Sequence, residues 1–392
     1  MTTGYQMYDP IFGTKDLADE FITDAWLVDK YVGNTMFTWG TNYYGELGLG
    51  SSGNSYSSPV QVGALTTWKQ VSMGQGNMAA IKTDGTLWTC GYGLGGVNGQ
   101  GNLTGYNSPV QVGALTNWKY VSFNTASPGL WGAIKTDGTL WACGGGAGTG
   151  NNNTTSYSSP IQVGTATNWK QVSYGSTIGG VQTNGTLWTW GSGGSGQIGN
   201  GAIASYSSPI QVGTATTWKQ VSIVSNTAAA IKTDGTLWTW GTGTNGQIGN
   251  GAIASYSSPI QVGSMTNWKQ VTTGATWVAA IKTDGTLWVW GSNPNGELGM
   301  ETITTQYSSP IQVGALTNWK QVTSGLISVA AIKTDGSLWT WGDVQTNAAG
   351  NVIGVGYYSS PVQVGALTNW KYVSSTLGYG LVAAITYTEL ST

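Results

Sequence analysis

Residues 231–241 read IKTDGTLWTWG, and this stretch decides the fold because it predicts two short strands joined by a tight turn. An Asp-Gly pair between alternating apolar residues is a strong hairpin signal, since a type I′ turn needs positive φ at both central positions. Equivalent pairs recur at Asp84-Gly85, Asp137-Gly138, Asn184-Gly185, Asp284-Gly285 and Asp335-Gly336. The chain is therefore expected to repeat one hairpin many times.

Two further phrases recur with the hairpin. Ser-Pro-(Val/Ile)-Gln-Val-Gly occurs seven times, with its prolines spaced 50, 51, 49, 50, 51 and 51 residues apart, and each copy is followed by Trp-Lys-(Gln/Tyr)-Val. A fixed period near fifty with short strands in each unit predicts a propeller or a related array. In the unit that starts at Trp218, four strands are expected, at 218–222, 228–233, 236–240 and 259–262. Both faces of these strands carry bulky residues, which suits sheets packed between two neighbours.

The two ends of the chain predict how the array closes. The last unit begins at Trp370 and stops before a third strand, whereas residues 35–40 form a third strand without a first or second. Together these fragments supply one complete blade, and a closed ring leaves no unpaired sheet edge. The sequence thus predicts an all-β, seven-bladed propeller over residues 33–392, preceded by an N-terminal anchoring segment, residues 1–32.

Composition limits the functions to consider. Charged residues make up 8% of the chain, the net charge is −2, there is no His, and all 14 basic residues are Lys. We expect no nucleic-acid binding, no cofactor and no metal site. The N-terminus has no basic region followed by an apolar run, so neither a signal peptide nor membrane insertion is expected. Cys90 and Cys143 replace a repeated Trp and are interpreted as small buried residues, with a disulfide between neighbouring blades as the alternative.

The repeat resembles a known family. Residues 229–241, AAIKTDGTLWTWG, with Gly-Glu-Leu-Gly at 45–48 and 296–299 or Gly-Gln-Ile-Gly at 196–199 and 246–249, resemble the repeat of the regulator of chromosome condensation family. The resemblance implies a seven-bladed β-propeller. The basic tail, the arginines and the wedge insertion of the eukaryotic regulator are missing, so it implies the fold and not nucleotide exchange. Residues 1–31 are similar to N-terminal segments of repeat proteins of marine bacterial viruses, on the run FITDAWL at 21–27.

One end of the ring is expected to carry a binding surface. The Asp-Gly turns and the links before Trp-Lys are nearly constant, whereas the loops between strands one and two and between strands three and four vary. Variable loops that gain aromatics on a constant frame are typical of recognition, and drift of unconstrained loops is the alternative. The candidate binding residues are Tyr43, Tyr44, Asn77, Tyr92, Phe123, Trp131, Asn152, Tyr174, Trp277, Asn293, Asn295, Leu326 and Tyr379.

Both chain ends should leave from the constant end, opposite the variable loops. Residues 1–32 would anchor the protein through Leu17, Phe21 and Trp26, as a short helix or as a strand or loop packed on the ring. The resulting prediction is a non-enzymatic component of a bacteriophage virion, in the tail, fibre or capsid surface, whose oligomeric state is set by the virion. Its partners would be virion proteins and a host surface protein or glycan.

Two other functions remain open, and one is not expected. The chain could act outside a virion as a protein-binding inhibitor or adaptor, or it could be a glycan-binding lectin. Catalysis is not expected, because a paired-carboxylate mechanism needs two carboxyls within about 5–10 Å, and Glu46 and Glu297 belong to blades that are two apart around the ring.

Overall fold

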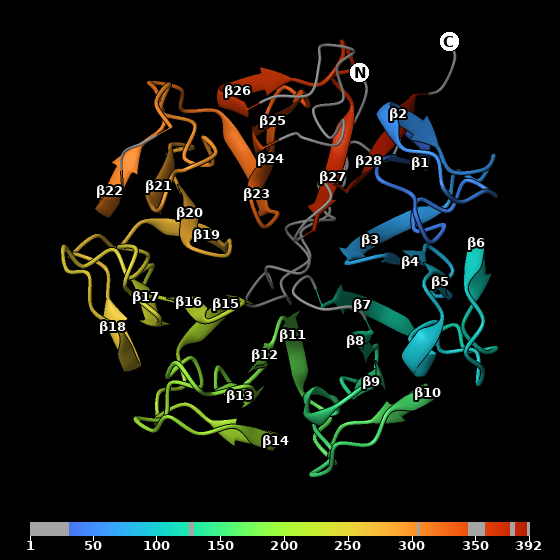
Figure 1. Ribbon diagram of the computed structural model, residues 1–392, viewed down its shortest axis with the longest axis horizontal. Coiled ribbons are helices and arrows are strands. Elements are labelled where there is room, and N and C mark those ends of the chain that lie inside the picture. The colour runs from blue at the N-terminus through green and yellow to red at the C-terminus, as the bar shows by residue number, and fades with distance from the viewer. Residues whose placement is uncertain (1–30, 125–128, 304–305, 344–356, 377–380, 390–392) are drawn as a thin grey trace, which may run out of the picture.

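The computed structural model describes residues 31–124, 129–303, 306–343, 357–376 and 381–389, and these form seven four-stranded antiparallel sheets arranged as a ring (Figure 1). The predicted fold class is confirmed. Six blades are consecutive in sequence, and the first strand of each lies nearest the axis of the ring. Blade 1 comprises β3 (Trp68–Gly74), β4 (Asn77–Lys82), β5 (Leu87–Gly91) and β6 (Tyr106–Gln111). Blade 2 comprises β7 (Trp118–Phe123), β8 (Leu130–Lys135), β9 (Leu140–Gly144) and β10 (Tyr157–Gln162). Blade 3 comprises β11 (Trp169–Tyr174), β12 (Thr177–Gln182), β13 (Leu187–Gly191) and β14 (Tyr206–Gln211).

Blade 4 comprises β15 (Trp218–Val224), β16 (Thr227–Lys232), β17 (Leu237–Gly241) and β18 (Tyr256–Gln261). Blade 5 comprises β19 (Trp268–Thr273), β20 (Trp277–Lys282), β21 (Leu287–Gly291) and β22 (Tyr307–Gln312). Blade 6 comprises β23 (Trp319–Ser324), β24 (Ser328–Lys333), β25 (Leu338–Asp343) and β26 (Tyr357–Gln363). The helices in the described residues are the three-residue 3-10 turns η1 (Leu94–Gly96) and η2 (Ala147–Thr149). Neither is long or apolar enough to cross a membrane.

Blade 7 closes the ring with strands from both termini. Its order is β2 (Tyr56–Gln61), β1 (Tyr31–Gly40), β28 (Val382–Glu389) and β27 (Trp370–Ser375), so blue and red strands meet in Figure 1. β1 pairs with β28 from Trp39 opposite Val382 to Tyr31 opposite Glu389. The predicted closure by two strands from each end is therefore confirmed, and the strand pairing starts at Tyr31.

The core lies between blades. In one cluster, Ile231 and Leu237 of blade 4 pack with Trp268, Val278 and Trp290 of blade 5. Second strands are buried on both faces because each is covered by a blade on either side, which explains why they combine small residues with aliphatic ones. Every blade thus depends on its neighbours for burial.

The predicted hairpin is present, but its turn is not type I′. Within the turn, φ is positive at Gly235 (+77°) and not at Asp234, and the Gly235 N–H donates to the Lys232 carbonyl over 3.0 Å. Asp234 instead stays in ordinary backbone geometry and its carboxylate accepts the Thr236 N–H at 2.9 Å and the Thr236 hydroxyl at 2.7 Å. Hairpins with three-residue loops use this arrangement, a turn followed by a left-handed glycine.

In six loops between third and fourth strands, one backbone carbonyl accepts a hydrogen bond from the next blade. The Nε1 of Trp240 donates to the carbonyl of Gln197 at 2.8 Å, and Trp290 and Trp341 bond the equivalent carbonyls of Gln247 and Glu297 at 2.9 and 2.8 Å. Cys90, at the same position in blade 1, places its sulfur 3.8 Å from the carbonyl of Glu46. We call the residue that supplies this carbonyl the slot residue: Glu46, Val97, Gly148, Gln197, Gln247 and Glu297.

Candidate recognition surface

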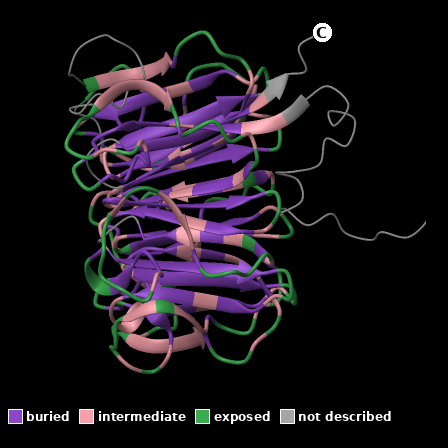
Figure 2. Ribbon diagram, turned by 90° about the vertical axis from the view of Figure 1, so that its right-hand side faces the viewer, coloured by how far each residue is buried: buried purple, intermediate pink, exposed green. Residues whose placement is uncertain are grey.

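The two ends of the ring carry different loops. Because strands alternate in direction, the loops between strands one and two and between strands three and four share one end, here called the variable end. The Asp-Gly turns and the links between blades share the other, the constant end. In Figure 2 the buried strands run between these ends, and exposed loops lie at both. β1 begins and β28 finishes at the constant end, as the sequence predicts.

Exposed aromatics gather at the variable end where blade 7 meets blade 1. Tyr43 and Tyr44 are 57% and 49% exposed, and the Tyr44 ring contacts the half-buried Tyr92 edge-on, with centroids 4.8 Å apart. A Cβ on Gly76 would lie 3.0 Å from Tyr44, so the ring rests directly on this glycine. We call Tyr43, Tyr44 and Tyr92 the tyrosine patch. It unites three of the predicted binding residues from two blades.

Four other predicted aromatics are not on the surface. Phe123, Trp131, Tyr174 and Trp277 are at most 1% exposed, so the expectation that they face a partner is wrong. For three of them, a glycine in direct contact explains the burial. A Cβ on Gly74 would lie 2.2 Å from Phe123, one on Gly132 would lie 2.1 Å from Tyr174, and one on Gly274 would lie 2.2 Å from Trp277. The aromatic fills volume that the glycine leaves, and glycine at the facing repeat position was the signal available in the sequence.

Two predicted asparagines also serve the frame. Asn77 and Asn293 are at most 2% exposed, so they are not surface contacts either. The Asn77 side chain donates to the Tyr92 carbonyl at 2.7 Å, and Asn293 accepts the Leu298 N–H at 2.9 Å. Buried polar groups need such partners. These asparagines therefore shape the loops that carry the exposed residues.

The remaining predicted residues are scattered around the ring. Asn152 is exposed and has a positive φ of 57°, Asn295 is half-buried, and Leu326 is half-buried with its carbonyl accepting the Trp277 indole at 3.1 Å. Tyr379 and the anchoring residues Leu17, Phe21 and Trp26 lie outside the described residues. The structure does not bring Asn152, Asn295 and Leu326 to the tyrosine patch, because they belong to loops of blades 2, 5 and 6.

The two loop glutamates are structural. Glu46 and Glu297 are each 1% exposed, and burial raises the pKa of both carboxyls. Glu46 accepts the Tyr44 N–H at 2.7 Å, as Glu297 accepts the Asn295 N–H at 2.9 Å. Gln197 does the same for Ser195 at 2.8 Å. A side chain that glutamine replaces in another blade acts as a hydrogen-bond acceptor for the loop tip.

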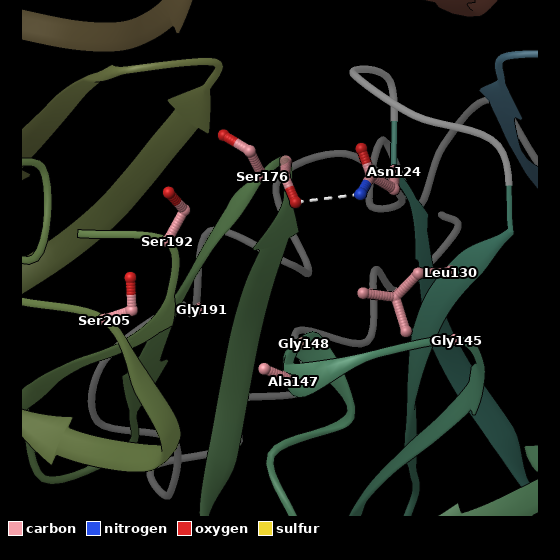
Figure 3. A pocket seen from close by; sticks show the side chains of 10 residues that line it. Asn124, Leu130, Gly145, Ala147, Gly148, Ser176, Gly191, Ser192 and Ser205 are labelled. Carbon is pink, nitrogen blue, oxygen red and sulfur yellow. Dashed lines mark hydrogen bonds between the residues drawn. The ribbon is translucent and has the colours of Figure 1, made fainter. Parts of the chain in front are cut away.

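A shallow hollow of about 390 Å³ lies at the variable end between blades 2 and 3 (Figure 3). Its lining includes the hydroxyl-bearing Ser176, Ser192 and Ser205, the apolar Leu130, and Asn124, whose amide donates to the Gly175 carbonyl at 2.9 Å. Serine needs an adjacent base to act as a nucleophile, and the chain has no histidine. The hollow therefore offers hydroxyl and amide hydrogen bonds beside the apolar Leu130.

The cysteines and acids do not add a reactive centre. Cys90 and Cys143 are free, buried thiols, so the disulfide alternative is not realised. Burial raises the pKa of the Cys143 thiol to about 12, which keeps it protonated. Among the described residues, no three His, Cys, Asp or Glu side chains gather in a way that could hold a metal ion.

Comparison with known proteins identifies the repeat. The model of the Regulator of chromosome condensation (RCC1) repeat matches residues 34–81, 184–231, 234–281 and 284–332, and a second model of that repeat matches 218–247. Among curated proteins, human E3 ubiquitin-protein ligase HERC2 is 35% identical over 80 residues, which are 20% of this chain. The aligned part spans only 2% of the length of that ligase.

Solved structures share the whole architecture. Prp20p from Saccharomyces cerevisiae has a TM-score of 0.80 and 17% identity, with 94% of this chain and 95% of that chain covered. Human WBSCR16 also has a TM-score of 0.80, with 18% identity and coverage of 91% and 100%. At these identities the likeness concerns the fold.

Proposed function

Because the chain is a seven-bladed propeller of regulator of chromosome condensation repeats, we propose that it is a non-enzymatic protein that binds another protein through its variable end. The observation that carries the proposal is the tyrosine patch, where aromatics from two blades are exposed on loops that buried residues hold in place. Tyrosine offers a large, rigid contact surface with a polar tip, and it is enriched where proteins bind one another.

Two further observations support binding over catalysis. The carboxylates of Glu46 and Glu297 each accept a backbone N–H of their own loop, and the lining of the hollow at Ser176 contains no basic side chain. The yeast protein Prp20p, which has this fold, binds Gsp1p and histones, so a ring of this kind is suited to protein partners. The partner of the present chain need not resemble either.

The finer proposal is a component of a bacteriophage virion. Its basis is the layout, in which the chain enters β1 at the constant end while the tyrosine patch lies at the variable end. Such a protein would be held in the particle by residues 1–32 and would present its loops to a host surface protein. A glycan is the second candidate ligand, since tyrosine rings stack on sugars and the loops near the patch carry little charge.

The proposal can be tested by placing a photo-crosslinking amino acid at position 43 or 44, and at Leu316 of the constant end as a control. Leu316 is 46% exposed, close to Tyr44 at 49%. A partner crosslinked from the patch but not from Leu316 is then purified and titrated. We expect Tyr44→Ala to weaken its binding by at least about tenfold, as for an interface hot spot, while Leu316→Ala has no effect. Equal affinities would reject the patch, and binding to a glycan array without a protein partner would favour the lectin.

A further inference from the structure

The constant end carries a ring of lysines that the function above does not use. The twelve lysines of the repeats all lie at this end, at the second residue of each first strand or at the last residue of a second strand. The first strands surround the axis in Figure 1, so their lysines surround the mouth of the ring. We call these seven the lysine ring: Lys69, Lys119, Lys170, Lys219, Lys269, Lys320 and Lys371.

The other five lysines have a structural role. Lys82, for example, is 7% exposed and holds its ammonium 3.5 Å from the centre of the Trp88 ring, a cation–π contact. Burial lowers the pKa of Lys82, and the negative charge of Asp84 in the adjoining turn raises it by a smaller amount. The turn aspartates therefore accompany these outer lysines. By contrast, lysines of the ring are half-buried or exposed.

Lys371 is repelled by its two neighbours in the ring. The pKa of Lys371 is lowered, first by burial and then by the charges of Lys320 and Lys69, its neighbours on either side. Like charges held together by a rigid frame create a positive potential that attracts anions. An acidic ligand across the mouth would relieve this repulsion.

An apolar arc lies on the same end. The link between blades carries an exposed Leu or Met at one repeat position in five consecutive junctions, whereas the two junctions that flank blade 3 have Ala166 and Ala215 there. The arc is centred on the side of blade 7. Its members, each 38–46% exposed, are Met265, Leu316, Leu367, Leu65 and Leu115. A ligand with both carboxylates and apolar side chains would match this half of the end.

The chain itself enters at this point. Asn34, near the start of β1, accepts a hydrogen bond from the Lys371 ammonium at 3.5 Å and forms a bridge with Thr67, two residues before Lys69. The preceding residues 1–30 contain six carboxylates and two lysines, together with the apolar Leu17, Phe21 and Trp26. This acidic segment is thus tethered between two members of the lysine ring, beside the apolar arc.

We propose that residues 1–30 bind the constant end of their own propeller, with carboxylates on the lysine ring and apolar side chains on the arc from Met265 to Leu115. A short tether gives millimolar effective concentration, so weak contacts suffice. Nucleic acid is the other polyanion to consider, and the arc argues against it because a phosphate backbone has no apolar side chains to pack on leucine. The proposal does not depend on the tyrosine patch.

Zero-length carbodiimide crosslinking of the full chain tests the contact, because it joins carboxylates to amines only when they touch. We expect crosslinks from acids of residues 1–30 to Lys320, Lys371 and Lys69, and few to Lys170 and Lys219 on the side without the arc. Raising the ionic strength to about 1 M shortens the Debye length to about 3 Å and should reduce the ring crosslinks several-fold.

A distance measurement covers the case in which crosslinks arise from random encounters. Nitroxides at Thr14→Cys and at the exposed Ala366→Cys report the position of the segment, since the native thiols are buried. We expect a narrow, short distance distribution that becomes broad and long in Lys69→Gln/Lys320→Gln/Lys371→Gln, and that is unchanged in Lys170→Gln/Lys219→Gln. A broad distribution in the unmodified ring, or one that ignores all these substitutions, would overturn the proposal.

Discussion

In blade 2 the tryptophan is on the second strand, at Trp131, and the small residue is on the third, at Cys143, which reverses the arrangement in blade 4. This reversal allows a quantitative prediction. In blade 4 the third-strand Trp240 faces Ala228, whereas in blade 2 the third-strand Cys143 faces the second-strand Trp131. Trp131 nevertheless donates its indole N–H to a slot carbonyl, that of Val97, at 2.7 Å. The large ring thus comes from the neighbouring strand and reaches the same kind of acceptor.

The two single substitutions should each be costly. Trp131 is fully buried, so Trp131→Ala should destabilise the protein by about 3–5 kcal/mol, the usual cost of removing a buried tryptophan. Cys143→Trp forces a second indole into the occupied site and should cost about 1–3 kcal/mol by overpacking. The double variant recreates the arrangement of blade 4, with alanine facing tryptophan. We expect it to lose only about 2–4 kcal/mol, against about 4–8 kcal/mol for the sum of the two single losses, which implies a favourable coupling of about 3 kcal/mol, near the upper end for residues in contact.

Urea unfolding followed by far-ultraviolet circular dichroism measures all four members of the cycle without relying on tryptophan fluorescence. The matched control installs the arrangement of blade 2 in blade 4: Trp240→Cys should be rescued in part by Ala228→Trp. Losses that simply add in both blades would show that the two tryptophans do not occupy equivalent volumes, and the account of Cys143 as a compensated substitution would then fail.

Two other substitutions probe the loops and the turns. Burial raises the folded-state pKa of Glu46 above its ordinary value of 4.5, so the stability that this group contributes to the wild type rises as pH falls through the folded pKa. Glu46→Gln should therefore unfold at a higher urea concentration than the wild type at pH 7.5 and lose this advantage near pH 4. An equal advantage at both pH values would exclude a buried carboxylate. Gly235 has a φ of +77°, and a Cβ there would lie 2.0 Å from the Thr266 carbonyl oxygen. Gly235→Ala should therefore lower the free energy of unfolding by more than the roughly 1–2 kcal/mol of a left-handed backbone alone. Gly194→Ala is the control, because a Cβ at Gly194 would have no atom within 4 Å and should change the urea midpoint little.

The architecture could be predicted because the same sequence repeat occurs in every blade. Each copy of the Trp-Lys and Asp-Gly phrases confirms the register of the others, and the incomplete first and last units can close only as one blade. The type of turn could not be read from Asp-Gly alone. It depends on the Thr266 carbonyl and on the Trp268 N–H, which donates to Gly235 at 3.1 Å, and both come from the next link.

The binding residues were harder to predict, because variation between blades has two causes. Tyr44 varies because its side chain is exposed, whereas Phe123 and Tyr174 vary because the facing residue in the previous blade is Gly74 or Gly132. Both kinds look the same when one strand position is compared across the repeats. Pairing each position with its facing neighbour separates them, since a large residue opposite glycine fills the interface between blades.

The slot residue explains how the loop tips are able to vary without cost to the frame. Its carbonyl accepts an indole or a thiol from the next blade, and where the slot residue is Glu or Gln its side chain also accepts the backbone N–H two residues earlier, at Tyr44, Ser195, Asn245 and Asn295. In these four loops the frame therefore holds the tip by a group that every residue except proline possesses. The side chain at that position is not required for this bond, so it can be tyrosine in one blade and serine or asparagine in another. A tip can therefore change its side chain while the bond that fixes its backbone remains, as the proposed recognition through the variable end requires.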